Sequence, residues 1–310
     1  MWRQLILGKV SLDRMKGAED LRRSLRGFLP VSDTVIVKPN WYSPHPANYT
    51  DAHALSLLMD AVDARFIVAE GYSLDRQDGS LKYTVDGEDV DWRWLMSHPE
   101  WDWIMEGDRL ERLKAQDRWF LDSHGFTDVL RDHGAEYVNV SEEIWMGRAL
   151  DPAEVKERVE SRYPPASTGR VYRFMPRKLA EHAGSTLISL GRVKGYGGAY
   201  PSLTLKNMFG LIPDPMRSWW HGQKDERLTA SILDIARVYA SYFRLYGVCE
   251  AFRNLTFSDD QGEVKTSWGC YGVKEVEGFR RPRLEPRRGG RLDLRPDRGG
   301  PGEGGLHRRR

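Results

Sequence analysis

Short apolar runs that end in polar turns alternate along this chain with stretches of helical period. Apolar runs within 33–40 and 65–71 predict two buried strands. Between them, Thr50 or Asp51 can cap a helix that runs to about Val62. The apolar face of this helix consists of Ala54, Leu57, Leu58 and Ala61. A strand, a loop, a helix and a second strand form a βαβ unit, so the pattern favours a parallel sheet.

The same alternation extends to both sides of this unit. The longest helical period covers 226–246, and its apolar positions, three or four residues apart, are Leu228, Ile232, Ile235, Tyr239 and Phe243. Further strands are predicted at 2–10, 135–140, 171–175 and 185–190, and shorter helices at 21–28, 127–133, 152–162 and 179–182. Two more apolar runs, 251–257 and 264–271, predict a hairpin around 259–262.

Residues 74–121 differ in texture from the rest, because tryptophans lie there among many charged residues. We interpret this stretch as an inserted helical subdomain whose tryptophans are Trp92, Trp94, Trp101, Trp103 and Trp119. They form either its small core or a stacking surface for a ring-shaped ligand. The sequence therefore predicts an α/β domain over 1–278, with a mostly parallel sheet flanked by helices and an insertion at about 74–121.

Composition excludes several classes of protein. The 310 residues are 40% apolar and 30% charged, which excludes a fully disordered chain, a collagen-like chain and a small disulfide scaffold. Cys249 and Cys270 can form at most one bridge and cannot supply the four ligands of a zinc site or an iron–sulfur cluster. No run has the length of a signal-peptide core or a membrane span. We therefore expect a cytoplasmic protein without a cluster and without a membrane partner.

Charge is distributed unevenly along the chain. Residues 279–310 carry 11 Arg and four acidic residues, a net charge of +7, which leaves the remaining 278 residues at −5 within a total of +2. A mildly acidic body gives no electrostatic case for binding nucleic acid. Only this segment, which we predict to be a disordered tail, offers such a case.

Cationic and amide side chains follow two of the predicted strands. Lys38 and Asn40 end the first, and Lys194 follows the strand that precedes a glycine-rich loop. Lys206 and Asn207 come next, in an apolar stretch where a lysine must be paired or must reach out to solvent. Open parallel sheets bind ligands at the carboxyl ends of their strands. We therefore predict that these residues bind a small carboxylate or phosphate, the alternative for Lys-Pro-Asn being plain turn chemistry.

Four further residues complete the candidate site. His221 and Lys206 are the candidate catalytic residues, and a packed loop histidine is the equal alternative for His221. Thr204 joins the predicted ligand-binding residues. Asp51 and Glu70 could orient the lysines or bind a divalent metal. No reaction follows from these residues, so whether the protein is an enzyme is left open, as is its oligomeric state.

Several of these segments resemble one known family. They are Val35-Ile-Val-Lys-Pro-Asn40, Thr50-Asp51, Ala69-Glu-Gly71, Leu187-Ile-Ser-Leu-Gly-Arg-Val-Lys194 and Thr204-Leu-Lys-Asn-Met-Phe-Gly210, followed by His221. Together they resemble the family called domain of unknown function 362 over about 30–73 and 120–278, the last segment being the most specific. The resemblance implies that the lysine and asparagine segments share one site. Many members also carry a ferredoxin-like Cys-x-x-Cys-x-x-Cys insert that this chain lacks, so no cluster is carried over.

The chain departs from the family pattern after Gly278. The family continues with Asp-Pro-Val-Ala-x-Asp-Ala and then Gly-x-Asp-Pro, whereas residues 279–310 are dominated by Arg, Gly and Pro. GC-rich DNA read out of frame gives such a composition, and a shift by one base is compatible with the family pattern. We hypothesise a frameshift near Gly278. The rival is a basic arm that binds nucleic acid or an acidic partner.

Three functions of different classes follow from these observations. The favoured one is binding, with or without transformation, of a small anionic ligand in a lysine-lined pocket at the strand ends. The second is a redox-associated protein related to the cluster-bearing members of the family. The third is nucleic-acid binding through the basic tail.

Overall fold

The computed structural model describes residues 17–26, 32–44, 48–76, 82–192, 203–214 and 217–250 with their side chains. It describes the main chain alone in the strands at 194–196, 200–202, 255–257, 263–266 and 269–274. The chain divides into two units, Met1–Lys274 and Glu275–Arg310. The second unit, with the predicted tail, lies outside the described residues, as does the predicted strand at 2–10.

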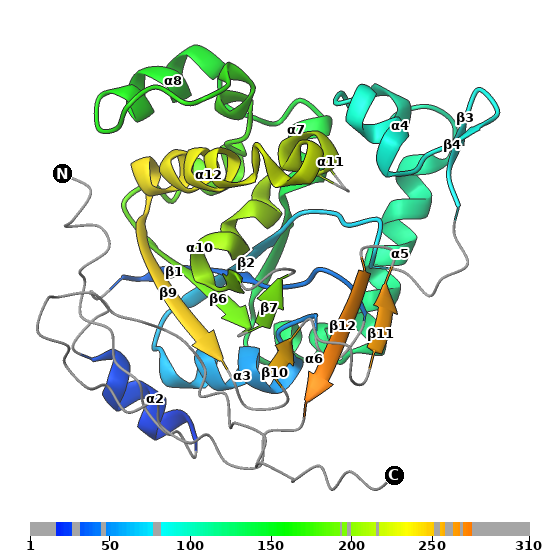
Figure 1. Cartoon of the computed structure of the whole chain (residues 1–310). Helices are drawn as coiled ribbons and strands as arrows, with labels where there is room; N and C mark the ends of the chain where they lie inside the picture. The colour runs from blue at the N-terminus through cyan, green and yellow to red at the C-terminus, as the bar shows by residue number, and fades with distance from the viewer. Residues whose placement is uncertain are drawn as a thin grey trace, which may run out of the picture. The chain divides into compact units, whose positions relative to one another are not determined.

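Five parallel strands form the central sheet of the first unit (Figure 1). They are β1 (Thr34–Pro39), β2 (Arg65–Glu70), β5 (Glu136–Asn139), β6 (Thr186–Arg192) and β9 (Arg244–Glu250). Their order across the sheet is β5-β2-β1-β6-β9, and each neighbouring pair is parallel. The strand order therefore reverses between β1 and β6, which is the doubly wound arrangement whose ligands bind outside the strand ends at that point. The predicted α/β fold with a parallel sheet is confirmed.

Strand register brings the carboxyl ends of β1 and β6 together. Ile36 pairs with Leu187, and Lys38 pairs with Ser189. Because side chains alternate along a strand, Lys38 emerges on the same sheet face as Ile36. That face is the one covered by the helices that follow β5 and β6.

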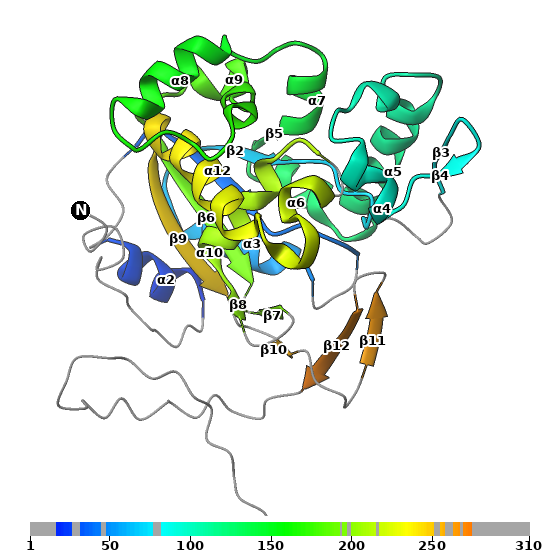
Figure 2. The same cartoon turned by 45° about the horizontal axis from the view of Figure 1, so that its top comes forward.

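One face of the sheet is covered by helices from the first half of the chain (Figures 1 and 2). These helices are α2 (Ala18–Leu25), α3 (Ala52–Ala61), α6 (Phe126–Asp132) and the end of α5 (Arg109–Ser123). The carboxylate of Asp51 caps α3 by accepting a hydrogen bond from the Ala54 amide at 2.9 Å. The predicted helix after Thr50 or Asp51 is thus confirmed together with its cap.

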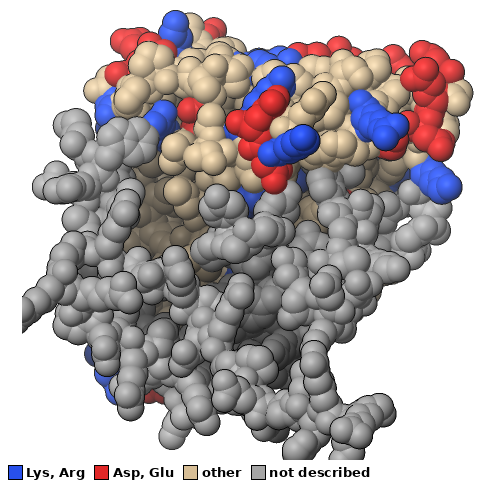
Figure 3. All heavy atoms as spheres, viewed as in Figure 1, with Lys and Arg blue, Asp and Glu red and all other residues tan. Residues whose placement is uncertain are grey.

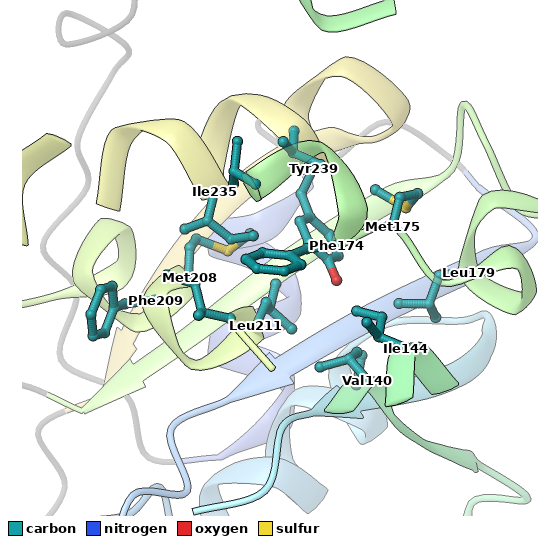
Figure 4. Close-up of a cluster of buried hydrophobic side chains, with 14 of the residues drawn as sticks. Val140, Ile144, Phe174, Met175, Leu179, Met208, Phe209, Leu211, Ile235 and Tyr239 are labelled. Atoms are coloured by element: carbon teal, nitrogen blue, oxygen red, sulfur yellow. The ribbon is translucent and has the colours of Figure 1, made fainter. Parts of the chain in front are cut away.

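The opposite face is covered by helices that follow β5 and β6 in the chain. They are α7 (Val140–Trp145), α8 (Pro152–Glu160), η2 (Gly169–Arg173), α9 (Arg177–Ala180), α10 (Thr204–Asn207), η3 (Met208–Leu211), α11 (Ser218–His221), η4 (Gln223–Asp225) and α12 (Leu228–Tyr242). Figure 4 shows how α12, η3 and the segment after η2 converge on one apolar core, where Phe174, Met208, Leu211, Ile235 and Tyr239 lie together. This core holds α10 and η3 against the carboxyl end of the sheet.

The stretch between β2 and β5 contains the predicted insertion. It consists of a two-stranded ribbon, β3 (Thr84–Val85) and β4 (Glu88–Asp89), then α4 (Trp92–Ser97), η1 (Asp102–Ile104) and α5. Trp101 and Trp103 are buried and belong to the same apolar core as the sheet face. These two tryptophans therefore pack as core residues, and Trp103 also borders the cleft described next.

A surface cleft of about 540 Å³ lies on this insertion. Trp94 and Trp103 line it, and its carboxylates are Asp86, Glu88, Glu100, Asp102 and Glu106. In Figure 3, acidic side chains gather at the upper right, the region where β3, β4 and α4 lie in Figure 1. The negative charge of this cleft would repel an anionic ligand.

A second sheet follows β6 and is described only along its main chain. It contains β7 (Lys194–Tyr196), β8 (Tyr200–Ser202), β10 (Leu255–Phe257), β11 (Glu263–Thr266) and β12 (Gly269–Lys274), in the order β11-β12-β10-β7-β8. β10 and β11 each pair antiparallel with β12 and not with each other. The predicted hairpin around 259–262 is therefore wrong, because the antiparallel pair joins β11 to β12 instead.

Two further sequence predictions are corrected. The predicted strand at 171–175 is wrong, because Val171 lies in the 3₁₀ helix η2, and a short apolar run alone does not distinguish a buried strand from a buried helical turn. The predicted helix 226–246 is too long. It ends at Tyr242, and Phe243 is extended with φ −124° and ψ 157°, so the edge strand β9 begins directly after it.

No helix in the described part of the chain combines the length and the apolar character needed to cross a membrane.

Replacement of Gly247 by Ala tests how α10 is seated on the sheet. A Cβ at Gly247 would lie 2.5 Å from Thr204 Oγ1 and 2.9 Å from Thr204 Cβ, so α10 must shift. We expect G247A to lower the free energy of unfolding by about 1–3 kcal/mol. The matched control is G169A, whose Cβ meets nothing within 4 Å and which should change stability by less than about 0.5 kcal/mol. Equal denaturant midpoints for the two variants would show that Thr204 does not press on β9.

Candidate functional site

The ammonium group of Lys38 lies buried where β1, β2 and α10 meet. Its side chain is 1% exposed. Nζ donates to Glu70 Oε2 at 2.8 Å, to the Pro39 carbonyl at 2.7 Å and to Asn207 Oδ1 at 3.2 Å. Since an ammonium has three N–H groups, these three acceptors satisfy all of its donors. Lys38 therefore joins the ends of two strands to the helix that follows β6.

Asn207 forms hydrogen bonds with both β1 and β6. Its Nδ2 donates to the Lys38 carbonyl at 2.9 Å and to Ser189 Oγ at 3.0 Å. Ser189 Oγ in turn donates to the Thr204 carbonyl at 2.8 Å. One amide side chain thus binds both strands at the point where the strand order reverses. We call Lys38, Glu70, Asn207 and Ser189 the strand-end lock.

Glu70 is as fully engaged as Lys38. In addition to Lys38, its carboxylate accepts from the Trp41 amide at 3.1 Å and from the Gly71 amide at 2.9 Å. Burial lowers the pKa of Lys38 to about 8, and the neighbouring Glu70 carboxylate opposes this shift. Arg217 and Arg76 lower the same pKa further through their positive charge. The pair is therefore a buried ion pair held within a cationic environment.

Gly210 allows the close approach that the strand-end lock requires. A Cβ at this position would lie 2.7 Å from Lys38 Nζ and 2.8 Å from Glu70 Oε1. Both neighbours are held by several hydrogen bonds and cannot move aside at low cost. Only glycine fits at position 210, where η3 lies against the ion pair.

A second buried ion pair supports the loops that follow β1 and β2. Arg76 pairs with Asp117 and donates to the carbonyls of Trp41 at 3.2 Å and Gly71 at 2.8 Å. Asp117 Oδ2 also accepts from the Tyr137 hydroxyl at 2.8 Å. Burial raises the pKa of Asp117, and Arg76 opposes that shift. These contacts fix the loops around the strand-end lock.

Arg217 adds a buried positive charge beside the same strand ends. Its guanidinium donates to the carbonyls of Phe209 at 3.0 Å, Gly210 at 2.7 Å and Tyr72 at 3.2 Å. These acceptors carry no net charge, and the carboxylates of Glu70 and Asp214 also act on the guanidinium, opposing the effect of burial on its pKa. Burial lowers the pKa of Arg217, which is the direction expected for a desolvated cation.

The two candidate catalytic residues meet at the ring of Phe209. Lys206 Nζ lies 4.1 Å from the ring centroid, and the His221 imidazole packs edge-to-face against the same ring at 5.0 Å. His221 is buried, and Trp92 of α4 contacts it at 5.4 Å. Burial lowers the pKa of His221 to about 4, the Lys206 and Arg217 charges lower it too, and Asp225 opposes them. His221 is therefore neutral at physiological pH.

The other candidates have structural contacts of their own. Asn40 Nδ2 donates to the Asn48 carbonyl at 2.8 Å and orders the loop after β1. Asp51 caps α3, and Thr204 lies over Gly247 on the sheet. The side chain of Lys194 lies outside the described residues. No group of three His, Cys, Asp or Glu side chains suited to a metal ion occurs within the described residues.

Sequence reasoning missed several residues that the structure places at these strand ends. Arg217 lies in a stretch without periodicity, and its left-handed backbone, φ 58°, leaves no signal in a single sequence. Ser189 lies within a predicted strand, where a single serine gives no sign of a functional role. Gly210 closes the most specific family-like segment, and a glycine just after a predicted site lysine was the one available signal for a close approach.

Comparison with known proteins gives one match. The family model described as "Domain of unknown function (DUF362)" matches residues 35–257. No curated protein and no solved structure matches the chain. The matched range spans all five strands of the central sheet except the first residue of β1, and it includes the whole strand-end lock.

Replacement of Lys38 by Met tests the buried ion pair. K38M leaves the Glu70 carboxylate buried without its cation, and we expect a loss of about 3–5 kcal/mol in the free energy of unfolding. The double variant K38M/E70Q removes both charges and should lose less than the sum of the two single variants. The control K178M removes an ammonium that pairs with Glu136 at the surface, both side chains being more than 40% exposed, and should cost less than about 1 kcal/mol. If denaturant titrations show that the double variant loses as much unfolding free energy as the two single variants together, Lys38 and Glu70 are not coupled.

His221 should make stability depend on pH between about 4 and 6.5. Its pKa of about 4 in the folded protein lies below the ordinary histidine value of 6.5, so the unfolded chain binds the proton more readily. The contribution is therefore present above pH 6.5 and is lost as the pH falls towards 4. Between pH 7.5 and pH 5, we expect the wild-type protein to lose about 2 kcal/mol more unfolding free energy than H221Q. Parallel pH profiles for the two proteins would show that His221 is not held neutral.

Proposed function

This chain belongs to the DUF362 family, and we propose that it binds a small anionic ligand, a carboxylate or a phosphate, at the carboxyl ends of β1 and β6. The observation that carries the proposal is the convergence of Lys206, Arg217 and His221 around Phe209, directly beside the strand-end lock. The ligand-binding charge belongs to Lys206, supported by the field of Arg217. His221 is the proton-transfer candidate beside them.

Topology supports this location. In open parallel sheets, the loops that leave two neighbouring strands in opposite directions create a crevice outside the strand ends. Here that reversal occurs between β1 and β6. Lys206 and Asn207 are consecutive residues of α10, so the helix that carries the candidate cation also bonds to Lys38 through Asn207. The cation is therefore tied to the sheet at this reversal.

Charge supports an anion rather than a cation. Burial is the largest cause of the lowered pKa of His221, and the positive charges of Lys206 and Arg217 lower it further, while Asp225 opposes them. In a buried environment the attraction between opposite charges is several times stronger than in water. A carboxylate or phosphate beside Lys206 would be attracted by the positive charges of Lys206 and Arg217. The acidic cleft on the insertion offers the opposite field and is not the proposed site.

Lys38, Asn207 and Glu70 have a different part in this proposal from the one the sequence suggests. The three donors of Lys38 are used within the protein, so we assign it to the floor of the site rather than to the ligand. Asn40, Thr204 and Lys194 stay in the proposal as residues of the surrounding loops. Both oxygens of Glu70 accept hydrogen bonds, and we assign no metal to it.

Replacement of Lys206 by Ala tests the proposal. We expect K206A to weaken the binding of inorganic phosphate or acetate about tenfold or more, because one charge-assisted hydrogen bond contributes about 1.5–3 kcal/mol. Loss of the contact between Lys206 and the Phe209 ring should cost about 0.5–1 kcal/mol of stability, so the variant should fold. The control is K156A, since Lys156 is exposed on α8. Calorimetric titration that gives the same affinities for K206A, K156A and the wild type would overturn the proposal.

A further inference from the structure

The turn that follows α11 has an unusual backbone. Gly222 has φ 73°, and Lys224 and Asp225 have φ 52° and 64°. Among the residues that the structure describes, only four non-glycine residues have positive φ, and Arg217, Lys224 and Asp225 are three of them. Each such residue costs on the order of 1–3 kcal/mol unless its surroundings enforce it. Three of them lie within nine residues, one directly before α11 and two in the turn after it.

The turn places the carboxylate of Asp225 next to the imidazole of His221. The helix ends at His221, and the chain then reverses through Gly222, where a Cβ would lie 2.7 Å from Glu226 Cγ. The result is a contact of 2.7 Å between Asp225 Oδ1 and His221 Nδ1. The carboxylate of Asp225 is 45% exposed, whereas the imidazole is 7% exposed. The left-handed turn therefore brings an accessible acid to a buried base.

This contact fixes the tautomer of the imidazole. An ionised carboxylate only accepts hydrogen bonds, so Nδ1 must carry the proton and Nε2 must carry the lone pair. The rings of Phe209 and Trp92, packed edge-to-face at 5.0 and 5.4 Å, hold the plane of the imidazole. The charged groups that act on His221 are Lys206 of α10, Arg217 before α11 and Asp225 of η4, and the two cations disfavour the imidazolium.

We propose that Asp225 is a positioning residue that holds His221 with its proton on Nδ1, so that Nε2 serves as the general base towards the anionic ligand. This inference rests on the proposed function. In the proton-transfer step, a C–H or O–H bond of the ligand breaks, the Nε2–H bond forms, and the electron pair stays on the ligand. Lys206 faces the negative charge that develops there, and Asp225 faces the imidazolium. The imidazolium then returns the proton to the ligand or to water.

Nitrogen-15 NMR of histidine-labelled full-length protein reads the tautomer directly, because protonated and unprotonated ring nitrogens resonate far apart. In the wild type at pH 7, we expect His221 to show Nδ1–H and an unprotonated Nε2 in most molecules. In D225N, whose neutral amide can also donate, a large fraction should carry the proton on Nε2, and D225E should restore the wild-type pattern. The matched control is D60N, because Asp60 contacts the Nε2 of His133 at 3.1 Å, at a distant Asp–His pair. D60N should leave the His221 signals unchanged.

Titration of the same proteins with inorganic phosphate separates this inference from the proposed function. D225N should bind phosphate within about twofold of the wild type, since the variant keeps Lys206 and the carboxylate that is replaced bonds to the imidazole of His221. An unchanged His221 tautomer in D225N, with phosphate binding still lost in K206A, would overturn the role of Asp225 alone. A tautomer that responds as expected in a protein that binds neither phosphate nor acetate would retain the His–Asp pair but overturn its proposed use.

Discussion

The strand ends depend on one buried ammonium group. Lys38 is inserted where two parallel strands and a helix meet, and its charge is tolerated there because Glu70, Pro39 and Asn207 provide an acceptor for each of its three protons. Such a group stabilises one arrangement of its surroundings and penalises others, since any shift leaves a charge buried without a partner. The doubly wound sheet therefore ends in a rigid polar floor rather than in loosely packed loops.

Next to these strand ends lie the groups that we assign to the ligand. Lys206 lies over Phe209 beside a neutral imidazole, and the turn from Gly222 to Asp225 is bent into left-handed conformations. Left-handed backbone at non-glycine residues costs free energy, whereas Lys206 is only half-buried. Strain and desolvated charge above a rigid base are typical of places where a protein meets a ligand. The division of labour between floor and ligand-facing groups is the central point of our proposal.

The fold could be predicted from sequence largely because its strands are short apolar runs with clear polar ends. β1, β2, β6 and α3 with its Asp51 cap all follow from local pattern. β9 was missed because Phe243 continues the four-residue spacing of α12, although it is already extended. The run 171–175 was misassigned because a buried 3₁₀ turn and a buried strand are equally apolar.

The site could be predicted only in part. The strand ends identified Lys38 and Glu70, and the apolar stretch around Lys206 identified Asn207. No local pattern shows that a lysine at residue 38 and an amide at residue 207 share a hydrogen bond across 169 positions. Arg217 and Asp225 have left-handed backbone conformations. Such a conformation cannot be recognised in a sequence when the residue is neither Gly nor Asn. Long-range pairing and local strain are the two kinds of information that a single sequence hides.

The missing side chain at Gly210 has a consequence for the evolution of this family. Because a methyl group there would touch both members of the ion pair, positions 38, 70 and 210 form one steric and electrostatic unit. A homologue with a larger residue at position 210 should therefore carry a shorter or an uncharged side chain at position 38 or 70. Divergence at these three positions should consequently be correlated, and subfamilies with a different floor to the crevice should be recognisable by that joint change.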